Sequence, residues 1–276
     1  MSIRIIVGLT LREAARRKVL QGLLILSLVF LALYGWGMGF VQEKIVQLGP
    51  PPARFFGVRD VYNFLLMAGL YAANFLIVML AVLTSVDTVA GEIASGTIQS
   101  LAVKPLRRRD ILLGKWLGFV LMLGVYTGVM VGGVMGVTAL ITGYTPPNPL
   151  AGLGLMFLEA LVLLSVSLLG GTRLSTLANG VLGFGLFGLA FIGGWIEQIG
   201  GILDSDAAVT IGHVASWLMP SEALWRFASS EMSQGLTQII SPFTGFAAPD
   251  PGVVIYAIAF AGVTLRLAVW QFNRRD

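Results

Sequence analysis

The chain has 276 residues, of which 56% are hydrophobic and 12% are charged, and its mean hydropathy is +0.85. A soluble domain carries about 25% charged residues, so a soluble enzyme, a disordered protein and a nucleic-acid reader are all disfavoured. The sequence has no cysteine and one histidine, His213, which excludes a disulfide framework and the usual zinc ligands. These quantities predict an integral membrane protein.

Six stretches are long and apolar enough to cross a hydrocarbon core of roughly 30 Å as helices. They cover residues 19–41, 61–86, 116–142, 150–170, 177–196 and 253–272. Nothing alternates with the period of a barrel strand. We therefore expect an all-α polytopic membrane protein that forms a single transmembrane domain over residues 1–276.

Two segments outside these stretches predict further helices. Residues 1–17 place Ile3, Val7, Leu11 and Ala14 at helical spacing with most charges elsewhere, which is typical of an amphipathic helix in the inner membrane interface. A plain cytoplasmic extension of the first span is the alternative. Residues 197–251 contain apolar pieces too short to span, and these predict short helices at the outer leaflet.

The few basic residues indicate an orientation. With the N-terminus inside, 14 of the 18 Lys and Arg residues lie at inner ends and loops, and 4 lie in outer segments. The positive-inside rule then places both termini in the cytoplasm of a multi-pass protein in the cell (inner) membrane. The basic pI near 9.6 is an orientation signal, so no nucleic-acid partner is needed to explain it.

Chemistry of its own is not visible in the sequence. It lacks a phosphate loop of the form G-x-x-x-x-G-K-[ST] and a zinc motif of the form H-E-x-x-H. A protein of this kind either conducts passively or is driven by a partner. A passive channel or membrane scaffold and an intramembrane lipid-modifying enzyme are the alternatives to a driven transporter.

The most informative cytoplasmic segment is the coupling loop, residues 88–110. An apolar stripe on a short helix is formed by Ala90, Ile93, Ala94, Thr97 and Leu101. Pro105 ends this helix, and Arg107, Arg108 and Arg109 follow at the level of the lipid headgroups. The stripe could pack on headgroups or on the ends of its own spans, or it could dock in a groove of a cytoplasmic protein.

The same segment resembles the loop of ABC-2-type permeases, also called type V ABC transporters. The resemblance lies in Glu92-x-x-x-Gly96-Thr97, then Pro105 with the basic cluster, and then Ile111-Leu-Leu-Gly114-Lys115. Its sharp part covers about 30 residues, although the six spans, the amphipathic start and the basic C-terminus fit along the whole chain. Ile98 replaces the leucine usual after Gly-Thr. Size and loop pattern are most similar to permeases of the NosY type.

The resemblance implies partners and roles. Two permease subunits pair, and each docks on a separate ATPase subunit that binds ATP and Mg²⁺, so this chain itself holds no cofactor and no metal. The coupling residues would be Glu92, Ile93, Gly96, Thr97, Leu101, Arg107, Arg108 and Arg109. The loop between the fourth and fifth spans would add Arg173 and Ser175, for which an ordinary polar turn is the equal alternative. Transport would be ATP-driven, with export the expected direction.

Polar residues within the spans are the candidates for a transport path or gate. Glu159 lies near the middle of the fourth span, where a carboxylate is costly unless it is protonated, paired or facing water. Asn63 and Asn74 of the second span are further candidates, and a neutral acid bonded to a neighbouring helix is the plain alternative. An outer cluster suggests a lid over the path or an ordinary interfacial belt; it consists of His213, Trp217, Pro220, Trp225 and Arg226.

Glycine is abundant, with 35 residues in the chain. Gly124, Gly128, Gly132 and Gly136 recur at every fourth position of the third span, and such a small-residue face allows close helix approach in lipid. Packing within one subunit is the preferred interpretation of this face, with a moving helix surface or a subunit interface as the alternatives.

Overall fold

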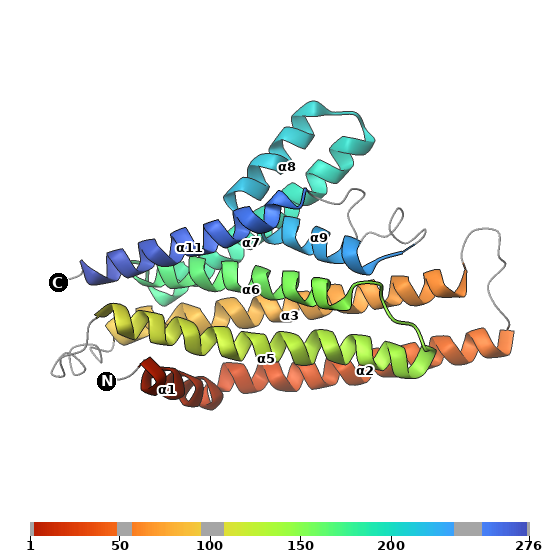
Figure 1. Ribbon diagram of the computed structural model, residues 1–276, viewed down its shortest axis with the longest axis horizontal. Coiled ribbons are helices and arrows are strands. Elements are labelled where there is room, and N and C mark those ends of the chain that lie inside the picture. The colour runs from red at the N-terminus through yellow and green to blue at the C-terminus, as the bar shows by residue number, and fades with distance from the viewer. Residues whose placement is uncertain (1–2, 49–56, 95–107, 235–249, 275–276) are drawn as a thin grey trace.

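The computed structural model describes residues 3–48, 57–94, 108–234 and 250–274, which are helical and contain no strand (Figure 1). The helices are α1 (Ile3–Arg16), α2 (Lys18–Leu48), α3 (Val58–Ala94), α5 (Arg108–Thr142), α6 (Pro149–Gly171), α7 (Thr176–Ile202), α8 (Asp206–Leu218), α9 (Ser221–Met232) and α11 (Gly252–Asn273). Six of them are long and apolar enough to cross a membrane, namely α2, α3, α5, α6, α7 and α11. The predicted fold class is confirmed.

Several helices run past the expected apolar stretches. The apolar part of α3 ends at Val86, but the helix continues to Ala94, which extends it by about 12 Å at 1.5 Å per residue. A separate coupling helix beginning near residue 88 is therefore not observed, because residues 88–94 are the end of α3. The rest of the predicted coupling helix lies outside the described residues.

The bundle has two central helices, α3 and α6, which pack against each other (Figure 1). α5 packs against both, and α2 lies against α3 and α5. On the other side of α6 lie α9 and α11. Both chain ends lie at one end of the bundle, which we call the terminal end, together with the turn between α6 and α7.

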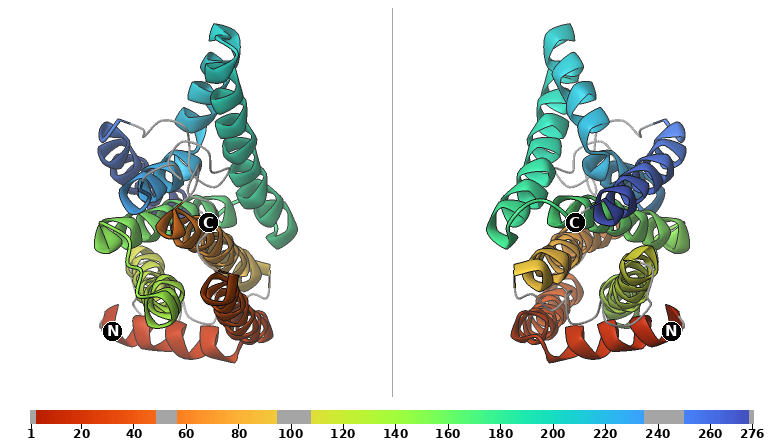
Figure 2. Two further views of the ribbon diagram at one scale, coloured as in Figure 1. Left: turned by 90° about the vertical axis from the view of Figure 1, so that its right-hand side faces the viewer. Right: turned by 90° about the vertical axis from the view of Figure 1, so that its left-hand side faces the viewer.

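α1 is a separate helix that lies crosswise to the spans at the terminal end (Figure 2). It packs on α5, where two glycines allow a close approach: a β-carbon at Gly114 would lie 2.7 Å from Ile6 Cγ2, and one at Gly118 would lie 2.9 Å from Thr10 Cβ. The buried residues of α1 are Ile6, Thr10 and Ala14. The predicted apolar stripe shares only Ala14 with this buried face, because Val7 and Leu11 lie on a neighbouring side of the helix. Docking on α5, rather than on lipid alone, selects this face.

α7 and α8 form a helical hairpin that leaves the main bundle at an angle (Figures 1 and 2). Asp204 adopts a positive φ of 49° in the turn between them. The helices touch through small residues, because a β-carbon at Gly193 would overlap Ala215 Cβ and one at Gly212 would overlap Glu197 Cβ. Among the described residues that precede α11, α8 and α9 are short helices, as the sequence predicts.

Packing within one subunit, the preferred interpretation of the glycine face of α5, explains only part of that face. Gly124 lies against Phe157, 3.5 Å from its ring. At Gly128, Gly132 and Gly136, no atom of the described residues lies within 4 Å of an added β-carbon. Packing within the subunit therefore accounts for Gly124 alone.

Candidate functional site

The central polar contact of the bundle joins Glu159 of α6 to Asn74 of α3. Asn74 Nδ2 donates a hydrogen bond to Glu159 Oε2 over 3.0 Å, and both side chains are buried. Glu159 lies near the middle of α6. Within the described part of the chain, Glu159 Oε1 and Asn74 Oδ1 have no hydrogen-bond partner. The pair thus leaves two unused polar atoms at the centre of the bundle, a costly arrangement that points to a functional role.

A second polar group lies where α7, α8 and α9 meet. The guanidinium of Arg226 donates two hydrogen bonds to Glu197, from Nη1 to Oε1 at 3.1 Å and from Nη2 to Oε2 at 3.0 Å. Arg226 is buried, and this two-pronged geometry is the strong form of an ion pair. His213 Nε2 lies 3.6 Å from Glu197 Oε1. Glu197 therefore joins three helices.

Glu222 lies one helical turn before Arg226 on α9 and is buried. Burial raises the pKa of Glu222 from 4.5 to about 8; the Arg226 guanidinium opposes this rise and the Glu197 carboxylate adds to it. Gly194 of α7 makes room for the side chain, since a β-carbon there would overlap Glu222 Cγ. A carboxyl group is thus held mainly protonated near neutral pH.

Electrostatic interactions link the two groups. Glu222 acts on Glu159, and both carboxyl groups act on Tyr71, which lies one turn before Asn74 on α3. The Tyr71 ring meets Trp225 edge-on, with centroids 5.4 Å apart. We call this set the polar cluster; it comprises Tyr71, Asn74, Glu159, Glu197, Glu222 and Arg226. It runs from the middle of α6 to the base of the α7–α8 hairpin.

A cavity of about 450 Å³ lies beside the Arg226 end of the polar cluster. Its polar lining includes Glu197, His213, Arg226 and Asp250, and its volume is in the range of small-molecule sites. Among the described residues, no group of three or more His, Cys, Asp or Glu side chains is arranged to hold a metal ion. The arrangement can balance charge and hold protons along a buried route.

The predicted coupling residues are only partly described. Glu92 and Ile93 fall in the last turn of α3, and Arg108 is the first residue of α5. Arg109 is exposed, with Nε 3.6 Å from Asp110 Oδ1. The remaining coupling residues lie outside the described residues; they are Gly96, Thr97, Leu101 and Arg107.

The α6–α7 turn lies at the terminal end, beside these helix ends (Figure 1). Ser175 caps α7, because its hydroxyl accepts a hydrogen bond from the Ala178 amide over 3.4 Å. Arg173 is exposed. Thr172 donates a hydrogen bond to Gln271 Oε1 over 2.7 Å, which fixes the turn to α11. Ser175 therefore has a structural role in the turn, while Arg173 is presented to the surroundings.

Asn63 is separate from the polar cluster. Eleven residues divide it from Asn74, about 16 Å along α3. Its Nδ2 atom donates to the Tyr144 hydroxyl at 2.5 Å and to the Met232 carbonyl at 3.3 Å. It thus joins α3 to the end of α9 and to the α5–α6 connection, away from the terminal end. The structure brings together Asn74 and Glu159 but not Asn63.

Sequence reasoning did not select Glu197 and Glu222 as site residues, and it placed Arg226 only in an outer cluster. Trp225 and Arg226 of that cluster are buried, whereas Trp217 is exposed. The available signal was the spacing of Glu222 and Arg226, four residues apart on one helix face. The contact with Glu197 joins positions 29 residues apart, and no local pattern predicts it.

Comparison with known protein families identifies the family of the chain. A family model described as ABC-2 family transporter protein matches residues 5–276, nearly the whole chain. None of the curated proteins matches the chain. The family match does not distinguish permease types, so the similarity to the NosY type stays a prediction.

Proposed function

The chain belongs to the ABC-2 family of transporter proteins and is a multi-pass permease subunit of an ABC transporter, and from this premise we propose that two copies pair and that each docks on a separate ATPase subunit. ATP and Mg²⁺ bind to those ATPase subunits, not to this chain. The terminal end faces the cytoplasm of a cell (inner) membrane, in keeping with its excess of Lys and Arg. The observation that carries the proposal is the family match over residues 5–276.

The ATPase subunit docks on the terminal end of the bundle. Support comes from α3, which extends about 12 Å beyond its apolar part. α5 begins with basic residues at the same end, and the α6–α7 turn presents Arg173 beside them. An extended helix end flanked by basic residues offers a lever on which a moving partner can act. Glu92, Ile93 and the residues up to Arg109 form the main contact, and Arg173 with Ser175 form a smaller one.

Transport proceeds by alternating access, which the spans cannot drive alone. Closure of the ATPase subunits on ATP moves the ends of α3 and α5, and hydrolysis resets them. The polar cluster is the gate on the path, because Glu159 and Asn74 sit on the two central helices and Glu197 links them to the hairpin through Glu222 and Arg226. Substrate leaves on the side away from the terminal end, so the direction is export.

The test is co-purification with the ATPase subunit and ATPase activity of the complex. The variant reverses charge at Glu92, Arg107 and Arg108 and carries Leu101→Asp. We expect loss of assembly or of ATPase stimulation. Lys44→Glu is the control, because Lys44 is exposed near the opposite end of α2. Unchanged assembly and ATPase activity in the variant would overturn the docking site, and flux through the chain alone in liposomes without ATP would favour a passive channel.

A further inference from the structure

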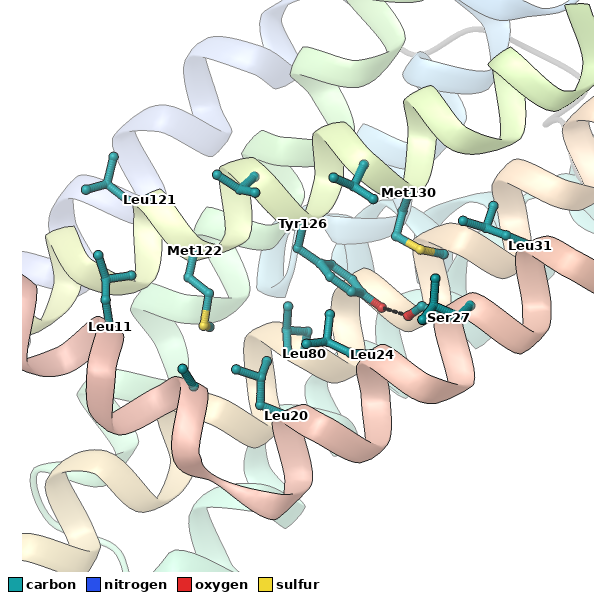
Figure 3. Close-up of a pocket in the computed structure, with 14 residues that line it drawn as sticks. Leu11, Leu20, Leu24, Ser27, Leu31, Leu80, Leu121, Met122, Tyr126 and Met130 are labelled. Atoms are coloured by element: carbon teal, nitrogen blue, oxygen red, sulfur yellow. Dashed lines mark hydrogen bonds between the residues drawn. The ribbon is translucent and has the colours of Figure 1, made fainter. Parts of the chain in front are cut away.

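An apolar cavity of about 520 Å³ lies between α1, α2, α3 and α5 (Figure 3). Its lining is almost entirely Leu, Val, Met and Ala, and the polar side chains in it are Ser27 and Tyr126. These two hydroxyls are hydrogen-bonded to each other over 2.6 Å, and Ser27 Oγ also donates to the Leu23 carbonyl. The cavity therefore offers no free polar group to a ligand, and an apolar chain is the chemistry that fits it.

The cavity has the depth of one membrane leaflet. Along α2 it extends from Leu20 to Leu31, about 16 Å at 1.5 Å per residue. Half of a hydrocarbon core of roughly 30 Å is about 15 Å. Leu24, Leu28 and Val125 at its rim are exposed, so the cavity opens sideways, toward the membrane interior.

The lining of the cavity suits an acyl chain. It contains no charged side chain, and its two hydroxyls are bonded to each other. An extended hydrocarbon chain is apolar along its whole length and about as long as the cavity is deep. Depth and lining together favour a single acyl chain.

Basic residues lie on α1 and at the start of α2, the two helices that meet beside the cavity. Leu11 and Ala15 line the cavity, and each is followed directly by an exposed arginine, Arg12 or Arg16. Lys18, also exposed, lies two residues before Leu20. Arg17 is paired with Glu13 at 2.7 Å, while Arg12, Arg16 and Lys18 form no ion pair with the described residues. This basic elbow is complementary to an anionic headgroup.

We propose that this cavity is a binding site for an anionic phospholipid, with one acyl chain between α2 and α5 and the phosphate on Arg12, Arg16 and Lys18. The lipid would hold α1 against the bundle, since α1 contributes both to the cavity and to the basic elbow. This inference does not depend on ATPase docking, and its test needs no ATPase.

The experiment uses the purified full chain in nanodiscs that contain phosphatidylglycerol with a photoreactive diazirine on one acyl chain. A parallel sample contains phosphatidylcholine with the same chain. After irradiation, adducts are mapped by mass spectrometry. We expect phosphatidylglycerol adducts concentrated in residues 20–31 and 121–130. The preference over phosphatidylcholine should be at least about fivefold, the factor expected for one engaged basic residue.

Two variants separate the headgroup from the chain. Arg12→Gln with Arg16→Gln should lower phosphatidylglycerol labelling toward the phosphatidylcholine level and leave only the preference due to Lys18, whereas Arg4→Gln, on α1 but distant from the elbow, should leave the labelling unchanged. Leu28→Trp fills the cavity and should lower labelling by both lipids. Leu33→Trp is its matched control, because Leu33 is exposed on α2 but does not line the cavity.

Three results would overturn the proposal. Equal labelling by the two lipids in the unchanged protein would remove the headgroup site, as would full phosphatidylglycerol labelling in the double arginine variant. Absence of adducts of either lipid in residues 20–31 and 121–130 would show that no acyl chain occupies the cavity.

Discussion

The central helices α3 and α6 and the peripheral helix α2 have nearly the same mean hydropathy but differ greatly in burial. The apolar windows of α3 and α6 have a mean hydropathy of 2.2 and are 67% buried, whereas that of α2 has a mean hydropathy of 2.1 and is 11% buried. Hydropathy therefore does not decide which helix becomes the core of a membrane bundle. Apolar side chains gain little free energy by moving from lipid into the bundle, because lipid tails are equally apolar. Close packing and polar contacts therefore determine which helices associate.

The polar side chains follow that division. Asn74 and Glu159, which meet at the centre, belong to α3 and α6. The buried hydroxyl of α2, Ser27, is bonded within an otherwise apolar cavity. The two central helices, α3 and α6, thus carry the buried polar and ionisable side chains, whereas α2 presents an apolar surface suited to lipid. Each prediction below tests this difference, in order of expected size.

The largest effect is expected at the ion pair that anchors α9 to α7. Arg226→Met removes a buried guanidinium and leaves the partly buried Glu197 without its two hydrogen bonds. The cost should approach the roughly 3–5 kcal/mol that removal of one partner from a fully buried pair costs. The free energy of unfolding in detergent, from reversible denaturation, measures it. Adding Glu197→Met should recover much of the loss, because the uncompensated charge is gone. A double variant as unstable as the single one would contradict this explanation.

The division between core and periphery predicts a contrast between two leucines. Leu70→Ala on α3 removes a fully buried side chain and should cost about 2–5 kcal/mol. Leu33→Ala on α2, where the side chain is 61% exposed, should stay within about 0.5 kcal/mol. Both are measured by the same denaturation assay. Equal costs would mean that another surface covers α2 in the assembled protein.

A smaller loss is expected at the central pair. Asn74→Leu leaves the buried Glu159 carboxyl without a donor, at a cost of about 1–3 kcal/mol. Adding Glu159→Leu should restore stability, since replacement of both partners by apolar groups is nearly neutral. Transport activity separates stability from function: if Glu159 is a gate residue, the double variant is stable and inactive. A stable and fully active double variant would remove Glu159 from the path.

Much of the fold could be predicted from the sequence because a membrane span leaves a strong local signal. Twenty apolar residues in a row fix a helix and its length, and the scarcity of charge made Glu159 stand out. Asn74 and Glu159 were both identified as polar residues within spans. Their contact was not predicted, because it depends on which faces of α3 and α6 meet.

The outer half of the polar cluster was harder to predict. Glu197 and Glu222 lie in an outer segment where acidic residues are common and usually solvated, so nothing in the composition of the segment distinguished them as site residues. The burial of Glu222 depends on Gly194, which admits its side chain, and the close contact of Glu197 with α8 depends on Gly212. α1 gives a similar case, since Gly114 and Gly118 of α5 select its buried face. Close contacts at glycine are tertiary properties that spacing alone does not determine.

The last prediction concerns the response of the polar cluster to pH. The pKa of Glu222 is about 8 in the folded protein and 4.5 in a solvated chain, so the folded state binds more protons between these values. The contribution is fully present below pH 4.5, and the free energy of unfolding falls as pH rises toward 8, by at most about 1.4 kcal/mol per pH unit.

Denaturation midpoints at pH 5, 6, 7 and 8 test this slope. Glu222→Gln stays neutral at every pH, so its midpoint should exceed that of the unchanged protein at pH 8 and match it at pH 5. Glu231→Gln, on the same helix and bonded to Asn148, is the control and should keep the slope. The groups around Glu222 are Arg226, Glu197 and Glu159. An Arg226→Met background should extend the fall in stability to pH values above 8, because the guanidinium opposes the rise in the pKa of Glu222. If the dependence of stability on pH persists in Glu222→Gln, another group causes it, and Glu222 does not titrate as described.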